Sequence, residues 1–326
     1  MLSESSRTPG SAANATSRPA AGDARPAARR RKRRMPVSDY LNMAPAVLLY
    51  SFFIILPALV VLVLSFFSWN GTDTPKWVGL ANWQFLLADG DAANSIAVTV
   101  KFTVVSWLLQ TTIAMTAGVA TAKSTRWAKA LVPLLVVPML LSTVGVAVLW
   151  QALLSPTFGG LSDLGTRLHL GFLASSNWLG NPQIVIYVIA VVVAWQNIPF
   201  HTLLYRAARQ QVPGNLYDAA LVDGASGAGQ FFHVTLPQIR NTILTSSLLI
   251  VVGTFSYFDL VFLLTGGGPG TASTVLAVDA YKQAFAALNF GYSSTLAVML
   301  VFVSVISGLL LMRLGGFSVE SRRGGE

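Results

Sequence analysis

The sequence contains no cysteine and few charged residues. Of its 326 residues, 11% are charged and 53% are hydrophobic, whereas soluble domains carry about 25% charged residues. The absence of cysteine excludes disulfide bonds, thiolate nucleophiles and cysteine-ligated metals. A chain this poor in charge cannot cover a water-facing surface, so we expect a membrane protein.

The sequence also lacks the patterns of a cofactor-dependent or ATP-hydrolysing enzyme. Its three histidines, His169, His201 and His233, are scattered without metal-ligand spacing. The glycine-rich stretch Gly266–Gly268 is followed by Pro-Gly-Thr, whereas a nucleotide-binding P-loop needs a lysine there. No nucleophile–base arrangement is visible. We therefore expect no metal, no other cofactor and no enzymatic activity in this chain.

Long apolar segments dominate the remaining sequence. A membrane helix needs about 20 mostly apolar residues, and backbone polar groups must be paired within lipid. Six segments qualify, at approximately 43–68, 96–121, 130–154, 182–205, 241–264 and 291–314. The predicted fold is therefore an all-α membrane protein with six transmembrane helices.

The distribution of lysine and arginine predicts the orientation of these spans. Nine of the 22 basic residues precede residue 35, and the loops 122–129 and 206–240 carry three each. The loops 69–95, 155–181 and 265–290 carry one each. Because basic residues favour the cytoplasmic side, both termini are predicted to be cytoplasmic.

The N-terminal 36 residues are rich in Ala, Ser, Pro, Gly and Arg, with a basic run at Arg29–Arg34. One interpretation is a nucleic-acid-binding arm. The long apolar segment that follows favours a disordered cytoplasmic tail that contacts membrane lipid and binds no nucleic acid. We thus divide the chain into this tail (1–36), a transmembrane domain (37–316) and a short cytoplasmic C-terminal tail (317–326).

The longest inner loop, 206–240, contains its own helix signals. Asn215 is a favoured N-cap residue, and Asp218 lies three positions later, where its carboxylate reaches back to the cap. A short helix is predicted over Leu216–Val222 and ends at Gly224. A second short helix is predicted over Ala228–Leu236. Pro237 then suits the first turn of the next membrane helix.

Within this loop a motif resembles a known family. Asp218-Ala219-Ala220, Asp223-Gly224-Ala225, Phe231, Val234 and Leu236-Pro237 are similar, at matching spacing, to the EAA motif of binding-protein-dependent ABC importer permeases. The departure is Asp218, where the family usually has glutamate. The resemblance implies that the loop docks on a separate ATPase subunit through Asp218, Ala219, Ala220, Asp223, Gly224, Ala225, Phe231, Leu236 and Pro237.

A second stretch resembles the carbohydrate branch of that family. It contains Phe258–Phe262, Thr265–Pro269, Tyr281, Phe285 and Gly291-Tyr292, as in maltose- and glycerol-phosphate-type permeases. The resemblance covers roughly residues 40–315. It implies the type I ABC importer permease fold and a subunit of a sugar importer. The implied partners are a second homologous permease, an ATPase dimer that uses the ATP, and an extracytoplasmic sugar-binding protein.

Polar groups inside the spans suggest where a substrate passes. Asp259 falls within the fifth predicted span, and a charge at the bilayer centre costs about 2.5–3.5 kcal/mol. With Tyr257 and Phe258 it forms a candidate substrate path, because sugars are held by carboxylates and aromatic rings. The alternative is a packing or gate residue near the outer surface. Gln151, Gln196 and Asn197 either line the path or bond across helices.

Three other functions remain open at this point. A secondary transporter driven by an ion gradient would need ion-coordinating acids at the midplane. A scaffold that recruits a cytoplasmic protein would use the 206–240 loop without transport. An ABC permease for a non-sugar solute would retain the coupling motif.

Overall fold

The computed structural model describes residues 37–122, 125–174 and 177–315. The predicted tails, 1–36 and 317–326, lie outside the described residues. The chain divides into two units after Ser51. The described part of the first unit is essentially α1 (Val37–Tyr50), and the second unit contains the other helices and the two strands.

Among the described residues, four helices are long and apolar enough to cross a membrane. They are Asn42–Leu64, which joins α1 through a π-helical turn (Ser51–Ile55) to α2 (Leu56–Leu64), and α4 (Gly90–Thr121), α9 (Val185–Gln210) and α16 (Phe290–Leu314). Two bent helix pairs pass the same test of length and hydropathy when each pair is taken together, which makes each a further candidate span. Within the described residues the number of candidate spans therefore reaches six, one for each predicted segment.

The third and fifth candidate spans each contain a break within the predicted segments 130–154 and 241–264. The third comprises α5 (Arg126–Val136), a 3-10 turn (Val137–Leu140) and α6 (Thr143–Leu154), bent by 100°. Its break follows from Ser142, whose hydroxyl accepts the Gly145 amide at 3.2 Å and starts a new helix.

The fifth span comprises α13 (Arg240–Phe255) and α14 (Asp259–Thr265), which meet at 49°. At the end of α13 the amides of Ser256 and Tyr257 bond three residues back, to the carbonyls of Gly253 and Thr254, at 3.0 and 3.3 Å. This tightened turn ends the α-helical ladder, and Gly/Ser pairs are common kink sites.

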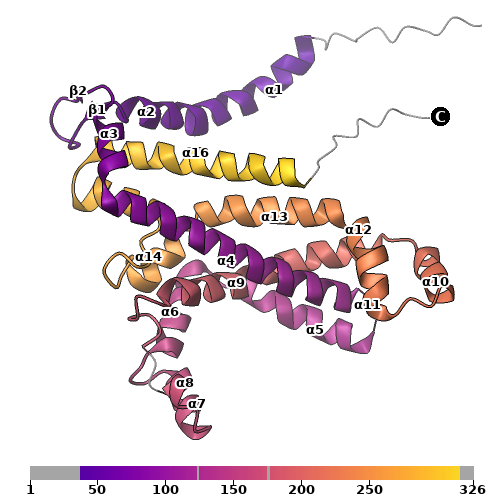
Figure 1. Ribbon diagram of the computed structural model, residues 1–326. Helices are drawn as coiled ribbons and strands as arrows, with labels where there is room; N and C mark the ends of the chain where they lie inside the picture. The colour runs from indigo at the N-terminus through magenta and orange to yellow at the C-terminus, as the bar shows by residue number, and fades with distance from the viewer. Residues whose placement is uncertain (1–36, 123–124, 175–176, 316–326) are drawn as a thin grey trace, which may run out of the picture. The chain divides into compact units, whose positions relative to one another are not determined.

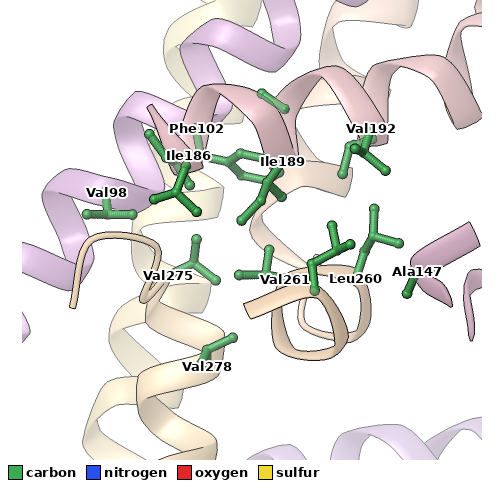
Figure 2. Close-up of a cluster of buried hydrophobic side chains, with 14 of the residues drawn as sticks. Val98, Phe102, Ala147, Ile186, Ile189, Val192, Leu260, Val261, Val275 and Val278 are labelled. Carbon is green, nitrogen blue, oxygen red and sulfur yellow. The ribbon is translucent and has the colours of Figure 1, made fainter. Parts of the chain in front are cut away.

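A buried apolar cluster explains why α14 turns inward (Figure 2). Leu260 and Val261 of α14 are fully buried and belong to the same cluster as Phe102 of α4 and Ile189 of α9. Burial of apolar side chains is the main favourable contribution to packing. The bend thus places α14 among α4, α6 and α9.

The helices α4, α9 and α13 form the close-packed centre of the second unit. A Cβ added to Gly118 of α4 would lie 2.8 Å from the backbone oxygen of Thr202 on α9, so the two helices need glycine at this contact. The buried hydroxyls of Thr254 and Thr103 bond at 3.1 Å, which connects α13 to α4.

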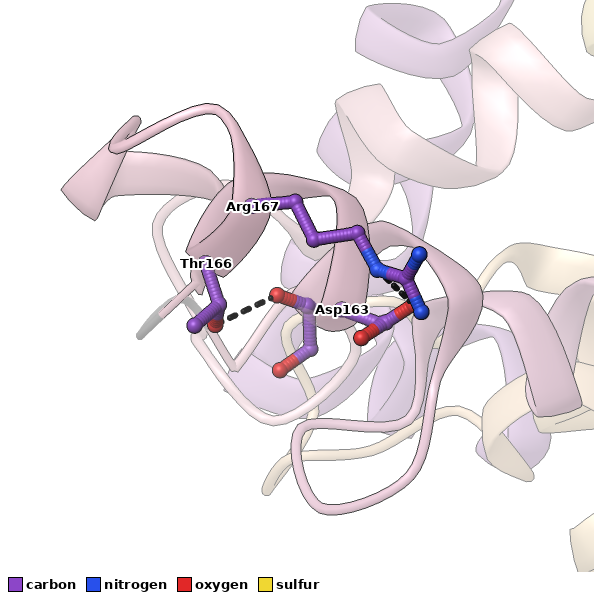
Figure 3. Close-up of polar contacts among 4 residues, drawn as sticks. Asp163, Thr166 and Arg167 are labelled. Atoms are coloured by element: carbon purple, nitrogen blue, oxygen red, sulfur yellow. Dashed lines mark hydrogen bonds and ion pairs between the residues drawn. The ribbon is translucent and has the colours of Figure 1, made fainter.

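The connecting segments contain the remaining elements. They are β1 (Phe67–Ser68) and β2 (Lys76–Trp77), paired antiparallel with Phe67 opposite Trp77, and α3 (Ala81–Ala88), α7 (Gly160–Arg167), α8 (Gly171–Ala174), α10 (Gly214–Val222), α11 (Gly227–Gln230), a π-helix (Phe231–Thr235), α12 (Leu236–Gln238), α15 (Leu276–Tyr281) and a π-helix (Lys282–Ala286). On α7, Arg167 and Asp163 form an exposed ion pair at 2.9 Å (Figure 3). Such a pair contributes little to stability.

Two groups of connectors lie at opposite ends of the second unit (Figure 1). The α10–α12 segment lies at one end, and α14 lies at the other with the β1–β2 hairpin and α3. The two candidate sites from the sequence are therefore far apart along the helices.

Candidate functional site

The segment α10–α12, called the coupling loop below, joins the span α9 to the span α13. Its first helix, α10, ends in a Schellman motif. The amide of Gly224 donates to the carbonyl of Leu221 at 3.0 Å, and the amide of Ala225 donates to that of Ala220 at 2.8 Å. Gly224 has a φ of +78°, which glycine adopts without strain. The predicted break at Gly224 is confirmed.

The start of α10 differs from the prediction. The helix begins at Gly214, its N-cap position is Pro213, and no side chain caps it. Asn215 therefore lies inside the first turn, and the predicted Asn215–Asp218 capping arrangement was wrong. Proline at this position fixes φ, here at −57°, so the chain enters the helix directly after it.

The second helix of the loop begins slightly earlier than predicted. The Ser226 hydroxyl accepts the Gly229 amide at 3.2 Å and caps α11. Helical structure then continues through the π-helix into α12, which contains Leu236 and Pro237. The span α13 begins only at Arg240, so Pro237 precedes the membrane helix instead of lying in its first turn.

A single tyrosine connects α10 to the end of α9 and to the π-helix of the coupling loop. The Tyr217 ring on α10 lies 3.7 Å from the guanidinium carbon of Arg209, near the end of α9. The Tyr217 hydroxyl bonds the Thr235 hydroxyl of the π-helix at 3.0 Å, and Thr235 is buried. The cation–π contact thus holds α10 against the end of α9, and the hydrogen bond holds it against the π-helix.

The outer face of α10 is exposed and partly apolar. Leu221 is 60% exposed and Val222 is 88% exposed, and the carboxylates of Asp218 and Asp223 are exposed beside them. A hollow of about 480 Å³ beside α10 is lined by Asp218 and Leu221 of α10, by Phe231 of the π-helix and by Arg209 of α9, among others. A braced helix with small and apolar exposed residues and flanking acids suits insertion into a basic groove.

The predicted coupling residues all lie on this one loop. Asp218, Ala219 and Ala220 are on α10, Asp223, Gly224 and Ala225 form its C-terminal turn, Phe231 is on the π-helix, and Leu236 and Pro237 are on α12. The sequence-based interpretation missed Tyr217, Arg209 and Thr235. The span α9 extends to Gln210, so Arg206 and Arg209 lie on that helix and not in the loop.

The candidate substrate-path residues lie at the bend of the fifth span. Tyr257 and Phe258 occupy the break, and Asp259 is the first residue of α14. Tyr257 is half-buried, with its ring edge-on to Phe102 at 6.3 Å. Asp259 is exposed. The three residues therefore adjoin in space, and the carboxylate is their accessible group.

The other polar span residues bond to backbone carbonyls. Gln151 of α6 donates to the Leu263 carbonyl of α14 at 2.7 Å. Gln196 of α9 donates to the Leu141 carbonyl at 3.3 Å. Asn197 donates within its own helix, to Val193. Gln151 and Gln196 thus connect neighbouring elements, in line with the interpretation that these residues bond across helices.

The glycine-rich segment after α14 forms a compact turn. Gly266 and Gly267 have φ of 60° and 89°. The Ser273 hydroxyl donates to the Gly268 carbonyl at 2.6 Å, and the Thr274 hydroxyl donates to that of Gly267 at 2.9 Å. Side-chain bonds to turn carbonyls hold the backbone in one conformation.

Behind this turn lies the buried carboxyl of Asp279 on α15. Burial raises the pKa of Asp279, and the negative charges of Asp89 and Asp91 raise it further, while Ser95 and Lys282 oppose the shift. Asp279 is therefore a buried acid with a raised pKa, whereas Asp259 is exposed.

Comparison with known proteins supports the resemblance. The model of the family described as "Binding-protein-dependent transport system inner membrane component" matches residues 110–318. The probable ABC transporter permease protein YurN of Bacillus subtilis is 29% identical, over 85% of this chain and 95% of its own length. The trehalose/maltose transport system permease protein MalF of Thermococcus litoralis is 29% identical, over 85% of this chain and 93% of its own.

A solved structure shares the fold. It is a chain of a bacterial alginate ABC transporter in complex with alginate pentasaccharide-bound periplasmic protein. The TM-score is 0.74 at 19% identity, and the match covers 85% of this chain and 93% of that one.

Proposed function

Because the chain belongs to the family of binding-protein-dependent transport system inner membrane components, we propose that it is the permease subunit of an ATP-driven sugar importer. It forms half of the translocation path in the bacterial inner membrane, with both termini cytoplasmic. A second homologous permease forms the other half. A separate ATPase dimer uses the ATP, and an extracytoplasmic sugar-binding protein delivers the substrate.

The coupling loop is the observation that carries this proposal. It projects at one end of the second unit, directly between the spans α9 and α13. Tyr217 braces it against the end of α9, while the outer face of α10 is free for a partner. A force applied to α10 is therefore passed to two membrane helices at once.

Alternating access follows from this arrangement. Closure of the ATPase dimer moves the two docked coupling loops together, and the attached helices α9 and α13 open the path outward. The binding protein then releases sugar near the bend of the fifth span, where the Asp259 carboxylate is exposed. Hydrolysis of ATP returns the path to its inward-open state.

The assignment of a sugar as substrate rests on two kinds of support. The relative from Thermococcus litoralis is a trehalose/maltose permease, and the structural relative was solved with an alginate pentasaccharide on its periplasmic protein. In this chain, the exposed Asp259 directly follows Tyr257 and Phe258, whose rings contact those of Phe102 and Phe262. Aromatic faces and carboxylate acceptors together match the apolar faces and hydroxyl groups of sugars.

Uptake by membrane vesicles tests the proposal. Vesicles containing both permeases and the ATPase should accumulate sugar when the binding protein is outside and ATP is inside. A hydrolysis-defective ATPase subunit should reduce accumulation to the background level. Uptake that persists with this defective ATPase and follows a proton or sodium gradient would instead indicate a secondary transporter. ATP-dependent uptake of a non-sugar solute alone would correct the substrate class.

A further inference from the structure

Six aromatic side chains, called the aromatic row below, form a continuous series of ring contacts at the α14 end. The centroid distances are 5.1 Å for Phe258–Phe262, 4.8 Å for Phe258–Tyr281, 5.0 Å for Tyr281–Phe285, 5.8 Å for Phe285–Phe290 and 5.5 Å for Phe290–Trp69. The row thus runs from the bend of the fifth span to the β1–β2 hairpin.

Exposure changes along the row. Phe258 and Phe262 pack against the central apolar cluster. Tyr281, on α15, is 38% exposed, and Phe285, on the following π-helix, is 63% exposed. Aromatic side chains normally bury most of their large area. The middle of the row therefore presents ring surface that the second unit itself does not cover.

A carboxylate accompanies the exposed rings. Asp259 is exposed next to Phe258, whose ring contacts Tyr281. We propose that Tyr281, Phe285 and Asp259 form an outer sugar-binding subsite, in which the rings stack on the apolar C–H face of a sugar and the carboxylate accepts its hydroxyls. This proposal rests on the proposed sugar-import function. It places a first binding position between the binding protein and the membrane interior.

Lipid is a poor occupant for this surface. Most exposed residues on α2 and α16 are aliphatic, such as Leu59 and Leu309, although Phe302 of α16 is also exposed. The exposed part of the row instead lies on α15 and its π-helix, outside the candidate spans, and the exposed Asp259 lies at the start of α14, next to Phe258 of the row. A carboxylate is costly against hydrocarbon but is an effective acceptor for a hydrated ligand.

The row is also continuous with the candidate substrate path. Phe258, near the inner end of the row, lies between Tyr257 and Asp259 in the sequence, at the bend. A sugar bound at Phe285 would therefore lie one ring contact from Tyr281 and two from Phe258. The row therefore leads from the exposed ring of Phe285 to the residues at the bend.

The test compares two substitutions at Phe285 that differ in ring surface. Phe285→Leu keeps an apolar side chain but removes the ring face, and Phe285→Tyr keeps the ring. Leu87→Ala is the matched control, because Leu87 is an exposed apolar residue of the same end, on α3. The probe is whichever of maltose, trehalose and maltotriose the wild-type vesicles import. Its affinity for the whole permease–ATPase complex in nanodiscs is measured by saturation-transfer NMR without binding protein.

Phe285→Leu should weaken sugar binding roughly fivefold, the expected scale of one aromatic stacking contact. Phe285→Tyr should stay within about twofold of wild type, because an aromatic contact is retained. Wild-type affinity in Phe285→Leu, or import by a wild-type complex that binds no sugar in this assay, would overturn the subsite. If Phe285→Leu instead lowers the amount of assembled complex recovered but leaves its sugar affinity unchanged, the subsite is wrong and the row is a contact surface for the second permease. Failure of ATP-dependent sugar uptake itself would contradict the underlying function.

Discussion

Replacing Gly224 with valine should reduce ATP-driven uptake at least tenfold while leaving the amount of membrane-inserted protein unchanged. Gly224 holds a φ of +78° in the Schellman motif that ends α10. A left-handed conformation costs an ordinary residue about 1–2 kcal/mol, and a β-branched residue is a genuine outlier there. The valine variant should therefore unwind the end of α10 and misplace the docking face.

Space is not the cause of this effect. A Cβ at Gly224 would meet no atom within 4 Å, so the substitution tests backbone conformation alone. Gly224→Asn is the matched control, because asparagine tolerates the left-handed region, and it should retain most of the uptake. The measurements are vesicle uptake and ATPase co-purification. Equal uptake in the valine and asparagine variants would show that this turn has no role in coupling.

Tyr217→Ala should uncouple the transporter, with ATP hydrolysis continuing while sugar uptake falls about fivefold or more. The substitution removes both the cation–π contact to Arg209 and the hydrogen bond to Thr235. These contacts contribute about 0.5–2 and 0.5–1.5 kcal/mol. Without them, α10 can dock on the ATPase but is no longer rigidly attached to α9.

Tyr217→Phe separates the two contacts. It keeps the ring over Arg209 and loses only the bond to Thr235, so uptake should fall less than in Tyr217→Ala. Adding Thr235→Val to Tyr217→Phe removes the buried hydroxyl that has lost its partner. The double variant should lose little further uptake, because both substitutions break the same hydrogen bond. The ratio of sugar imported to ATP hydrolysed is the readout. An unchanged ratio in Tyr217→Ala would contradict the bracing role.

Long apolar runs predicted the spans because membrane helices are specified by composition over about 20 residues. The breaks at 141–142 and 256–258 were not predictable in this way, since the runs continue through them. The bend before Asp259 depends on the burial of Leu260 and Val261 against α4 and α9. Those contacts join residues far apart in the sequence, which a local hydropathy pattern does not contain.

The coupling loop was predicted in outline but not in its bracing. Gly224 signals a helix end by its own conformational preference, so the break was visible. The cap at Asn215 was wrong because Pro213 starts the helix earlier. Tyr217 was missed because its partners lie 8 and 18 positions away, at Arg209 and Thr235. A sequence motif identifies the residues of a site, but which of them contact one another depends on the three-dimensional fold.

The central claim, that α10 docks on the ATPase, is tested most directly by site-specific crosslinking. The chain has no cysteine, so a single introduced thiol reports one position. Val222 is 88% exposed on α10, and Leu87 is 82% exposed at the opposite end of the second unit. Val222→Cys, labelled with a photoactivatable maleimide in the assembled complex, should form an adduct with the ATPase subunit, and Leu87→Cys should form none. An active, ATP-dependent complex in which Val222→Cys gives no such adduct would contradict the account.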